Sequence, residues 1–234
     1  MSSQPVATSS FRTSQFRPDA INRLQTRFEH SLDHGQLRRI EAKELLFAEG
    51  DTVSHVYKIE TGVLALFRVL ADGRRQVLEF AYPGDIVGLG VDNEYTMNAQ
   101  AVKPTRVRCL SMAVLRHSAA SDPDLAFKLY DTMARELAAT RDLMLTTGQR
   151  SAMERVASFL LAFSRRNQRK GQNPANIDLP MTRADIGDFL GLTIETVSRT
   201  FTKLKLMRLI ELPHSNEVKL LDINRLDDLA GGSR

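Results

Sequence analysis

The sequence predicts an α+β protein with an N-terminal antiparallel β sandwich or roll, a long helix and a C-terminal winged helix-turn-helix unit. Glycines recur about every ten residues between Glu41 and Leu115, as turns between short strands do. After Ser121-Asp122-Pro123, helical periodicity runs without further proline as far as Gly148. The segment Leu179 to Met207 has the pattern of two helices joined by a tight turn. A chain of 234 residues is long enough for two ordinary domains.

The N-terminal residues predict a flexible arm. Residues 1–18 are rich in Ser, Thr and Gln and lack apolar periodicity. They have no apolar core like that of a signal peptide, and no run in the chain approaches the roughly 18 apolar residues of a membrane helix. A single cysteine, Cys109, excludes an intrachain disulfide and agrees with a reducing compartment. We therefore expect a cytoplasmic protein that makes no contact with membranes.

The segment 19–120 is expected to form the β domain. Its first part, up to Ile40, predicts short helices, because apolar residues recur at helical spacing at Leu24, Phe28 and Leu32. The run VLALFRVL, followed by ADG and RRQVLEFAY, predicts a hairpin that turns at Asp72-Gly73. A second turn is predicted at Pro83-Gly84-Asp85.

The segment 121–148 is expected to be one long helix that starts near Ser121-Asp122-Pro123. Residues spaced 4, 3, 4 and 3 apart form a heptad seam on it, namely Met133, Leu137, Thr140, Met144 and Thr147. This narrow stripe fits packing against the chain's own β domain or pairing with a second copy in a homodimer. We favour the homodimer, because the stripe includes Thr and Met as well as Leu.

The segment 149–234 is expected to be the C-terminal domain. Arg150 to about Arg169 predicts its first helix, Leu209 to Leu221 a two-stranded wing, and Asp222 to Ala230 a last short helix. From Gly148 onward the chain has 14 Lys and Arg against 10 Asp and Glu, so this part carries the whole net charge of +4. A basic domain beside a neutral one is typical of nucleic-acid binding, although a basic solvent-exposed face is commoner.

The helix-turn-helix segment has the expected capping and turn residues. Thr182 with Asp185 three residues later predicts a capped helix start, and Thr193 predicts the cap of the second helix. Gly191 lies where the turn needs a residue without Cβ, and Gly187 allows the two helices to approach closely. The apolar stripes that would pack together consist of Ile186, Leu190, Leu192, Val197, Phe201 and Leu204.

The opposite face of the second helix carries side chains that recognise bases. Arg199 can donate two hydrogen bonds to guanine O6 and N7, Glu195 can accept one from cytosine N4, and Ser198 can bond to either neighbour. A helix in the major groove of double-stranded DNA reads bases with the side chains near its N-terminus. Glu195 could instead favour the helix dipole and pair with Arg199 at i,i+4 spacing. That alternative explains two charges but not the whole pattern.

Contacts with the DNA backbone are expected where the helices start. Hydroxyls and backbone N–H groups at helix N-termini commonly meet phosphates, and these contacts position a domain without reading sequence. The residues expected to contact phosphates are Thr182, Arg183, Thr193, Thr196 and Lys203.

The segment TRADIGDFLGLTIETVSR and the wing after it closely resemble the CRP/FNR superfamily, and within it the FNR and FixK-like branch. The resemblance covers nearly the whole chain. It includes the glycine-punctuated segment with its PGDIVGLG turn, the long helix and the terminal LDDLAGG. It implies a double-stranded β-roll of the cyclic-nucleotide-binding type, a dimerisation helix and a winged helix-turn-helix.

The resemblance also implies how such a protein reads DNA. In this superfamily the E-x-x-S-R triplet carries base readout, and it falls here on Glu195, Ser198 and Arg199. Ile194 stands where cyclic-AMP-responsive members have an arginine, which favours a half-site resembling TTGAT over TGTGA. The resemblance further implies an activator that binds an inverted repeat and contacts RNA polymerase. The genes that such an activator regulates would serve low-oxygen respiration, nitrogen fixation or denitrification.

No cofactor, metal site or enzymatic activity is expected. Gly88 to Ala101, where the family's cyclic-nucleotide binders supply an arginine, contains no Lys or Arg. One cysteine cannot hold an iron-sulfur cluster, which takes four thiolates in FNR-like sensors. The five histidines show no ligand spacing, and the chain has no nucleophile elbow and no phosphate loop. Two alternatives stay open: a sensor that depends on haem or another small ligand, and a ligand-binding signalling module whose C-terminal motif no longer binds DNA.

Overall fold

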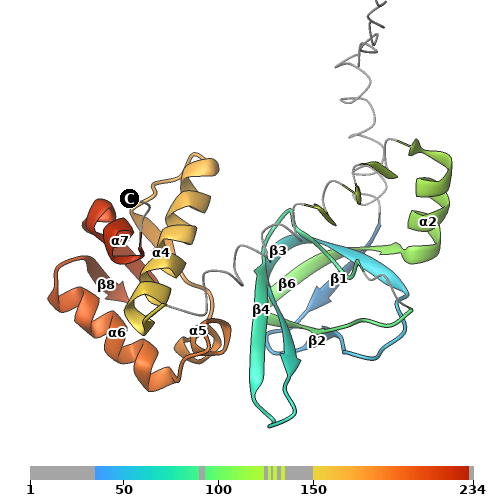
Figure 1. Cartoon of the computed structure of the whole chain (residues 1–234). Helices are drawn as coiled ribbons and strands as arrows, with labels where there is room; N and C mark the ends of the chain where they lie inside the picture. The colour runs from blue at the N-terminus through green and yellow to red at the C-terminus, as the bar shows by residue number, and fades with distance from the viewer. Residues whose placement is uncertain are drawn as a thin grey trace, which may run out of the picture.

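The computed structural model describes residues 35–89, 93–123, 126–127, 129–130, 133–134 and 150–231. Within these ranges the chain forms an antiparallel β-roll with a helix at its end, and a C-terminal lobe of helices with a small sheet (Figure 1). This is the α+β architecture that the sequence predicts. The predicted arm and the face of Leu24, Phe28 and Leu32 lie outside the described residues.

The β-roll is built from six antiparallel strands. They follow the order β1-β6-β3-β4, with β2 also paired to β6 and β5 to β3. The strands are β1 (Gln36–Ile40), β2 (Leu45–Phe47), β3 (His55–Val69), β4 (Arg75–Ala81), β5 (Ile86–Val87) and β6 (Asn98–Ser111). Register shifts between β3 and β6 around Thr61 and Val63 add local twist, which helps the long strands to curl around a core.

The two predicted turns are confirmed. The N–H of Gly73 donates to the carbonyl of Leu70 at 2.9 Å, and the N–H of Leu70 donates to the carbonyl of Arg74 at 2.8 Å. At the second turn, the N–H of Asp85 donates to the carbonyl of Tyr82 at 2.9 Å. The first turn places β4 at the edge of the sheet, facing the C-terminal lobe.

Two expectations about element boundaries are wrong. Gln36–Ile40, expected to be helical, forms strand β1, because it pairs with the distant residues Thr105 to Cys109 of β6. The residues up to Leu115 were expected to be extended, but helix α2 (Met112–Ser121) starts directly after β6. Met112 and Leu115 are buried on one helical face, and Ser111 makes no side-chain cap that would have marked the helix start.

The predicted long helix is only partly described. Residues 126–127, 129–130 and 133–134 are helical, and the N–H of Ala126 donates to the carbonyl of Asp122 at 3.1 Å. Met133 is 40% exposed. The other seam residues, Leu137, Thr140, Met144 and Thr147, lie outside the described residues.

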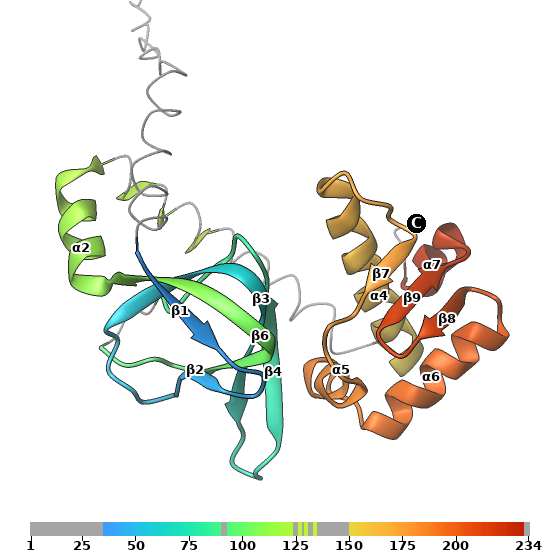
Figure 2. The same cartoon turned by 180° about the vertical axis from the view of Figure 1, so that it is seen from behind.

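The C-terminal lobe packs four helices against a three-stranded sheet with the order β7-β9-β8 (Figure 2). Its elements are α4 (Ala152–Arg169), β7 (Asn176–Asp178), α5 (Arg183–Leu190), α6 (Ile194–Leu206), β8 (Ile210–His214), β9 (Glu217–Leu220) and α7 (Ile223–Leu229). Strands β8 and β9 confirm the predicted wing, whereas β7 was not predicted. No helix within the described ranges is long and apolar enough to cross a membrane.

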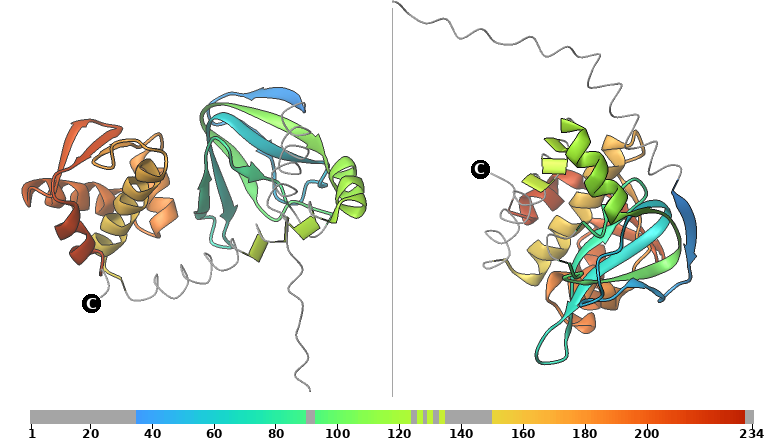
Figure 3. Two further views of the ribbon diagram at one scale, coloured as in Figure 1. Left: turned by 90° about the horizontal axis from the view of Figure 1, so that it is seen from above. Right: turned by 90° about the vertical axis from the view of Figure 1, so that its right-hand side faces the viewer.

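One apolar core joins the two lobes, which lie side by side in Figure 3. Phe67, Val77 and Phe80 of the roll belong to the same buried cluster as residues of α4, α5 and α6. The ring of Phe80 lies 5.4 Å from that of Phe189 in α5, measured between centroids. The helix-turn-helix is therefore docked against β4 rather than carried on a free linker.

Candidate nucleic-acid interface

The first helix of the motif, α5, starts with the predicted capping box. The Thr182 hydroxyl oxygen accepts a hydrogen bond from the N–H of Asp185 at 3.1 Å. In return, the Asp185 carboxylate accepts from the N–H of Thr182 at 3.0 Å and from its hydroxyl at 2.7 Å. These bonds satisfy N–H groups that a helix start otherwise leaves without partners.

The turn between the helices depends on two glycines. Gly191 has φ +64° and ψ +41°, the left-handed conformation that glycine adopts without strain, and its N–H donates to the carbonyl of Gly187. A Cβ atom on Gly187 would lie 2.6 Å from the carbonyl oxygen of Leu192. Both predicted glycine roles are confirmed, and together they fix the angle between α5 and α6.

The second helix, α6, buries one face and exposes the other. Thr193 caps it by accepting from the N–H of Thr196 at 3.2 Å. Val197, Phe201 and Leu204 are buried. This face anchors the helix in the C-terminal lobe, so its orientation follows from the apolar spacing of the sequence.

The exposed face of α6 brings the predicted base-reading residues together. Glu195, Ser198 and Arg199 are all exposed, and Ile194 before them is 47% exposed. Within the described part of the chain, Glu195 and Arg199 form no ion pair or hydrogen bond with each other, so the intrahelical pairing considered above is not seen. Both charged groups, the Glu195 carboxylate and the Arg199 guanidinium, therefore face solvent on one surface.

The predicted phosphate-contacting residues differ in their environments. Thr182 and Thr193 are exposed, but their hydroxyls hold the helix starts, and the hydroxyls of Thr193 and Thr196 lie 3.0 Å apart. Lys203 is exposed. The Arg183 guanidinium instead lies over the ring of Phe201, 3.6 Å from its centroid. Burial lowers the pKa of Arg183, and its Nη1 atom is buried without a hydrogen-bond partner.

Contacts from the roll hold α5, and they were not predicted from the sequence. The Arg75 guanidinium donates to the carboxylates of Asp185 at 2.7 Å and Asp188 at 3.1 Å. The Gln76 side-chain amide donates to the carbonyl of Asp188 at 2.7 Å. These partners lie more than a hundred positions apart, so no local pattern could have indicated the pairing.

The interior of the roll is filled by aromatic side chains. Tyr95 is buried and stacks on Phe47 with a centroid distance of 4.0 Å, and its hydroxyl donates to the carbonyl of His55 at 2.7 Å. Cys109 is half-buried beside this cluster, and burial raises the pKa of its thiol. The described residues contain no group of three or more His, Cys, Asp or Glu side chains arranged to hold a metal ion.

Two family models match the chain. A Crp-like helix-turn-helix domain matches residues 154–229, and a cyclic nucleotide-binding domain matches residues 37–122. The first range covers the lobe with α5 and α6, and the second covers the β-roll.

Individual relatives match over most of the chain. It is 39% identical over 204 residues to the transcriptional activatory protein AadR of Rhodopseudomonas palustris, covering 85% of each chain. It is 38% identical over 209 residues to the nitrogen fixation regulation protein FixK of Bradyrhizobium diazoefficiens, covering 86% of this chain and 88% of that one. The solved structure of FixK2 from Bradyrhizobium japonicum matches with a TM-score of 0.80 and 34% identity over 86% of this chain and 99% of that one. These relatives are transcription regulators and not enzymes, and the protein belongs with them to the CRP/FNR family, in its FNR/FixK-like branch.

Proposed function

We propose that the protein is a cytoplasmic transcription activator that binds, as a homodimer, an inverted repeat with TTGAT-type half-sites. The observation that carries this proposal is the exposed surface of α6, where Glu195, Ser198 and Arg199 lie together near the helix N-terminus. A recognition helix contacts base edges with its N-terminal residues. Arginine paired with guanine and glutamate paired with cytosine are the chemically matched contacts for such a surface.

The choice of half-site rests on Ile194. This exposed side chain precedes Glu195 and has no hydrogen-bonding group, so it makes only apolar contact, such as with a thymine methyl. An arginine at this position would instead favour a further guanine. The resemblance supplies the two half-sites to be compared, and an apolar residue at this position agrees with the TTGAT type, which the FNR and FixK-like branch implies.

The regulated process is proposed from the relatives. AadR bears the name of a transcriptional activatory protein, and FixK that of a nitrogen fixation regulation protein. By this analogy the protein activates transcription of genes such as those for nitrogen fixation. The resemblance to the FNR and FixK-like branch extends the proposal to low-oxygen respiration or denitrification, and to contact with RNA polymerase. The homodimer is proposed because an inverted repeat requires a two-fold symmetric protein.

DNA binding is proposed to need no cyclic nucleotide and no metal cofactor. The segment from Gly88 to Ala101 supplies no cation for a phosphate, and Tyr95 in that segment is buried against Phe47. An effector-dependent regulator that binds haem or another small ligand in the roll is the alternative.

The test is a titration of the purified protein, without added ligand, against a duplex with two TTGAT half-sites and against the same duplex with the guanine of each half-site replaced. We expect the replacement to weaken binding by about 1 to 3 kcal/mol for each lost bidentate contact, which is about 5- to 150-fold. Equal affinity for both duplexes would contradict base reading. An affinity that appears only with cyclic AMP or haem would favour the alternative.

A further inference from the structure

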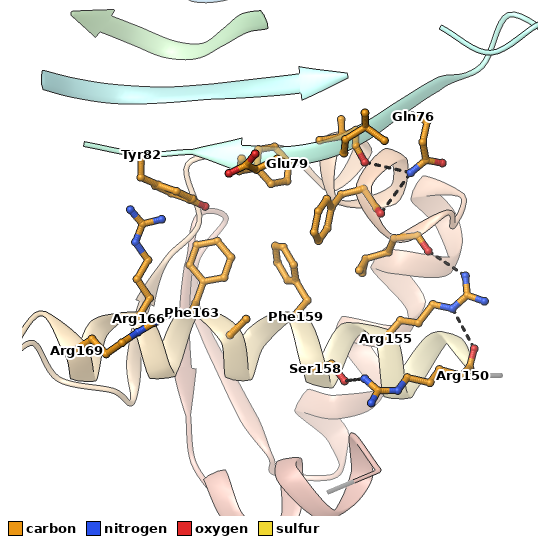
Figure 4. Close-up of a pocket in the computed structure, with 16 residues that line it drawn as sticks. Gln76, Glu79, Tyr82, Arg150, Arg155, Ser158, Phe159, Phe163, Arg166 and Arg169 are labelled. Atoms are coloured by element: carbon orange, nitrogen blue, oxygen red, sulfur yellow. Dashed lines mark hydrogen bonds between the residues drawn. The ribbon is translucent and has the colours of Figure 1, made fainter. Parts of the chain in front are cut away.

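A cavity of about 510 Å³ lies between β4 of the roll and α4 of the C-terminal lobe (Figure 4). Its walls are mostly apolar, and Phe80, Phe159, Phe163 and Phe189 contribute to it from three different elements. The rings of Phe159 and Phe163 lie 5.0 Å apart and those of Phe159 and Phe189 lie 5.8 Å apart, between centroids. Small-molecule sites in proteins have volumes of about 300 to 1,000 Å³ and predominantly apolar walls.

Arginines from the α4 side give the cavity a strongly basic edge. They are Arg150, Arg155, Arg166 and Arg169, whereas Glu79 is the single acidic residue among the described residues that line the cavity. In the helix, residues 155, 159, 162, 166 and 169 recur at the spacing of one helical face, so α4 presents its aromatic and basic side chains to the same space.

The direct hydrogen bonds of Arg150 and Arg155 go to neutral groups. The Arg150 guanidinium donates to the Ser158 hydroxyl at 2.8 Å, and the Arg155 guanidinium donates to the carbonyls of Arg150 and Leu190, each at 3.0 Å. All these acceptors are neutral. Within the described chain, neither Arg166 nor Arg169 forms an ion pair.

Arg166 is the most constrained of the four. Its guanidinium lies 3.4 Å from the centroid of the Tyr82 ring, and burial lowers its pKa. The Tyr82 hydroxyl is itself buried without a hydrogen-bond partner. Arg166 is half-buried at the cavity wall, and the nearby Asp85 carboxylate favours its charged form without forming an ion pair with it. An anionic group in the cavity would supply that direct contact.

We propose that this cavity binds a small organic anion with a flat apolar body. The apolar body packs between Phe163, Phe159 and β4, and the anionic group lies against Arg166 and Arg169. This site is distinct from the interior of the roll, where Tyr95 and Phe47 fill the space. Because a bound anion would touch both lobes, it would also change the affinity for DNA, and this consequence alone rests on the proposed function.

The test uses the full-length protein without DNA, so its outcome does not depend on DNA recognition. The probes are 8-anilinonaphthalene-1-sulfonate, a flat apolar anion whose fluorescence rises in apolar sites, and N-phenyl-1-naphthylamine, its uncharged counterpart. The variants are Arg166→Gln, which removes the charge, and Ala162→Phe, which fills the cavity from a position that lines it. The matched control is Arg165→Gln, because Arg165 neighbours Arg166 on α4 but faces Asp227 at 3.8 Å, away from the cavity.

We expect one molecule of the sulfonate per chain. Arg166→Gln should weaken sulfonate binding by about tenfold or more, as for a lost charge-assisted contact, and leave binding of the uncharged probe within about twofold. Ala162→Phe should weaken both probes, and Arg165→Gln neither, with thermal unfolding midpoints that confirm folded variants. Sulfonate binding that is unchanged in both Arg166→Gln and Ala162→Phe would overturn the proposal. A separate titration with random duplex DNA examines the competing role. An Arg166→Gln variant that keeps its sulfonate affinity but binds this DNA more weakly would also overturn the proposal, because the arginines would then serve DNA phosphates.

Discussion

Individual side chains on the helix-turn-helix are proposed to divide into base readers and backbone contacts. Arg199 is exposed on α6 and forms no ion pair with Glu195. Arg183, the first residue of α5, instead lies over the ring of Phe201. A bidentate arginine reads one base pair, but an arginine on a phosphate releases a counterion at any sequence. Replacing Arg199 and replacing Arg183 should therefore change DNA binding in different ways.

We expect Arg199→Ala to abolish the preference for the guanine of each half-site, a loss of about 1 to 3 kcal/mol of discrimination per half-site. Glu195→Ala should relax the choice at a neighbouring base pair. Arg183→Ala should weaken specific and random DNA alike and flatten the salt dependence, because one fewer counterion is released per subunit. The measurement is titration against matched and singly substituted duplexes at several salt concentrations.

A control is needed because Arg183 also covers an aromatic ring, so its loss affects packing. Lys203→Ala provides it, since Lys203 is exposed on α6 and should give the same flattened salt dependence with an unchanged unfolding midpoint. If Arg199→Ala kept full base discrimination and lost affinity uniformly, Arg199 would be a phosphate contact and the base-reading assignment would be wrong.

The thiol of Cys109 should be unreactive in the native protein. It is half-buried beside the core of the roll, and burial raises its pKa, so little thiolate is present at neutral pH. We expect slow modification by a thiol reagent at pH 7 and an acceleration when the protein is unfolded by urea. Rapid modification of the folded protein, with loss of DNA binding, would instead identify Cys109 as a redox switch.

At the scale of single elements, α5 is held at both ends. Asp185 caps its start and also pairs with Arg75 of the roll, and the Gln76 amide bonds to the Asp188 carbonyl near its end. Asp185 is 19% exposed in its side chain. Burial alone would raise the pKa of this carboxyl, but hydrogen bonds from Thr182 and Arg75 outweigh it and lower the pKa.

The lowered pKa of Asp185 predicts how stability depends on pH. The stabilisation is fully present above the unfolded pKa of about 3.9 and is lost as the pH falls through the lower pKa of the folded state. We expect Asp185→Asn to lower the unfolding midpoint at pH 7, because a lost cap typically costs about 1 kcal/mol, and to make the midpoint less sensitive to pH below about 4. Thermal unfolding followed by circular dichroism at several pH values measures both effects.

The control for Asp185→Asn is Asp227→Asn. The Arg165–Asp227 ion pair is solvent-exposed, and exposed ion pairs contribute little to the free energy of unfolding, so this control should leave the midpoint nearly unchanged. Arg75→Ala separates the two roles of Asp185. It removes the contacts of the roll with both Asp185 and Asp188 but leaves the cap of α5, so it should lower the midpoint while the capping box stays intact. A midpoint for Asp185→Asn equal to that of the wild type would contradict both roles.

At the scale of the whole molecule, the heptad spacing predicts a dimer. Met133, the described member of that seam, is 40% exposed in the single chain, so it is available to a second copy. We expect Leu137→Asp to give monomers that lose specific DNA binding, because a carboxylate in a two-fold seam would face its own symmetry mate. Sedimentation measures the oligomeric state, and a variant that stays dimeric would show that the seam lies elsewhere.

The sequence by itself determined the helix-turn-helix in detail. Thr182, Asp185, Gly187 and Gly191 act through neighbours a few residues away, so their spacing alone fixes the caps, the turn and the exposed face of α6. The turns at Gly73 and Gly84 were predictable for the same reason. The glycine spacing predicted a sandwich or roll, and the resemblance to a family narrowed this to a roll and supported the proposed base-reading triplet.

Only the tertiary structure decided the features that join distant segments. The strand β1 exists because it pairs with β6, and β7 because it pairs with β9, so their own residues carry no sufficient signal. The contact of Arg75 with α5 and the aromatic cavity between β4 and α4 likewise bring together residues far apart in the chain. Local propensity reports interactions within a few residues, whereas strand pairing and the docking of one lobe on another depend on which surfaces meet when the chain folds.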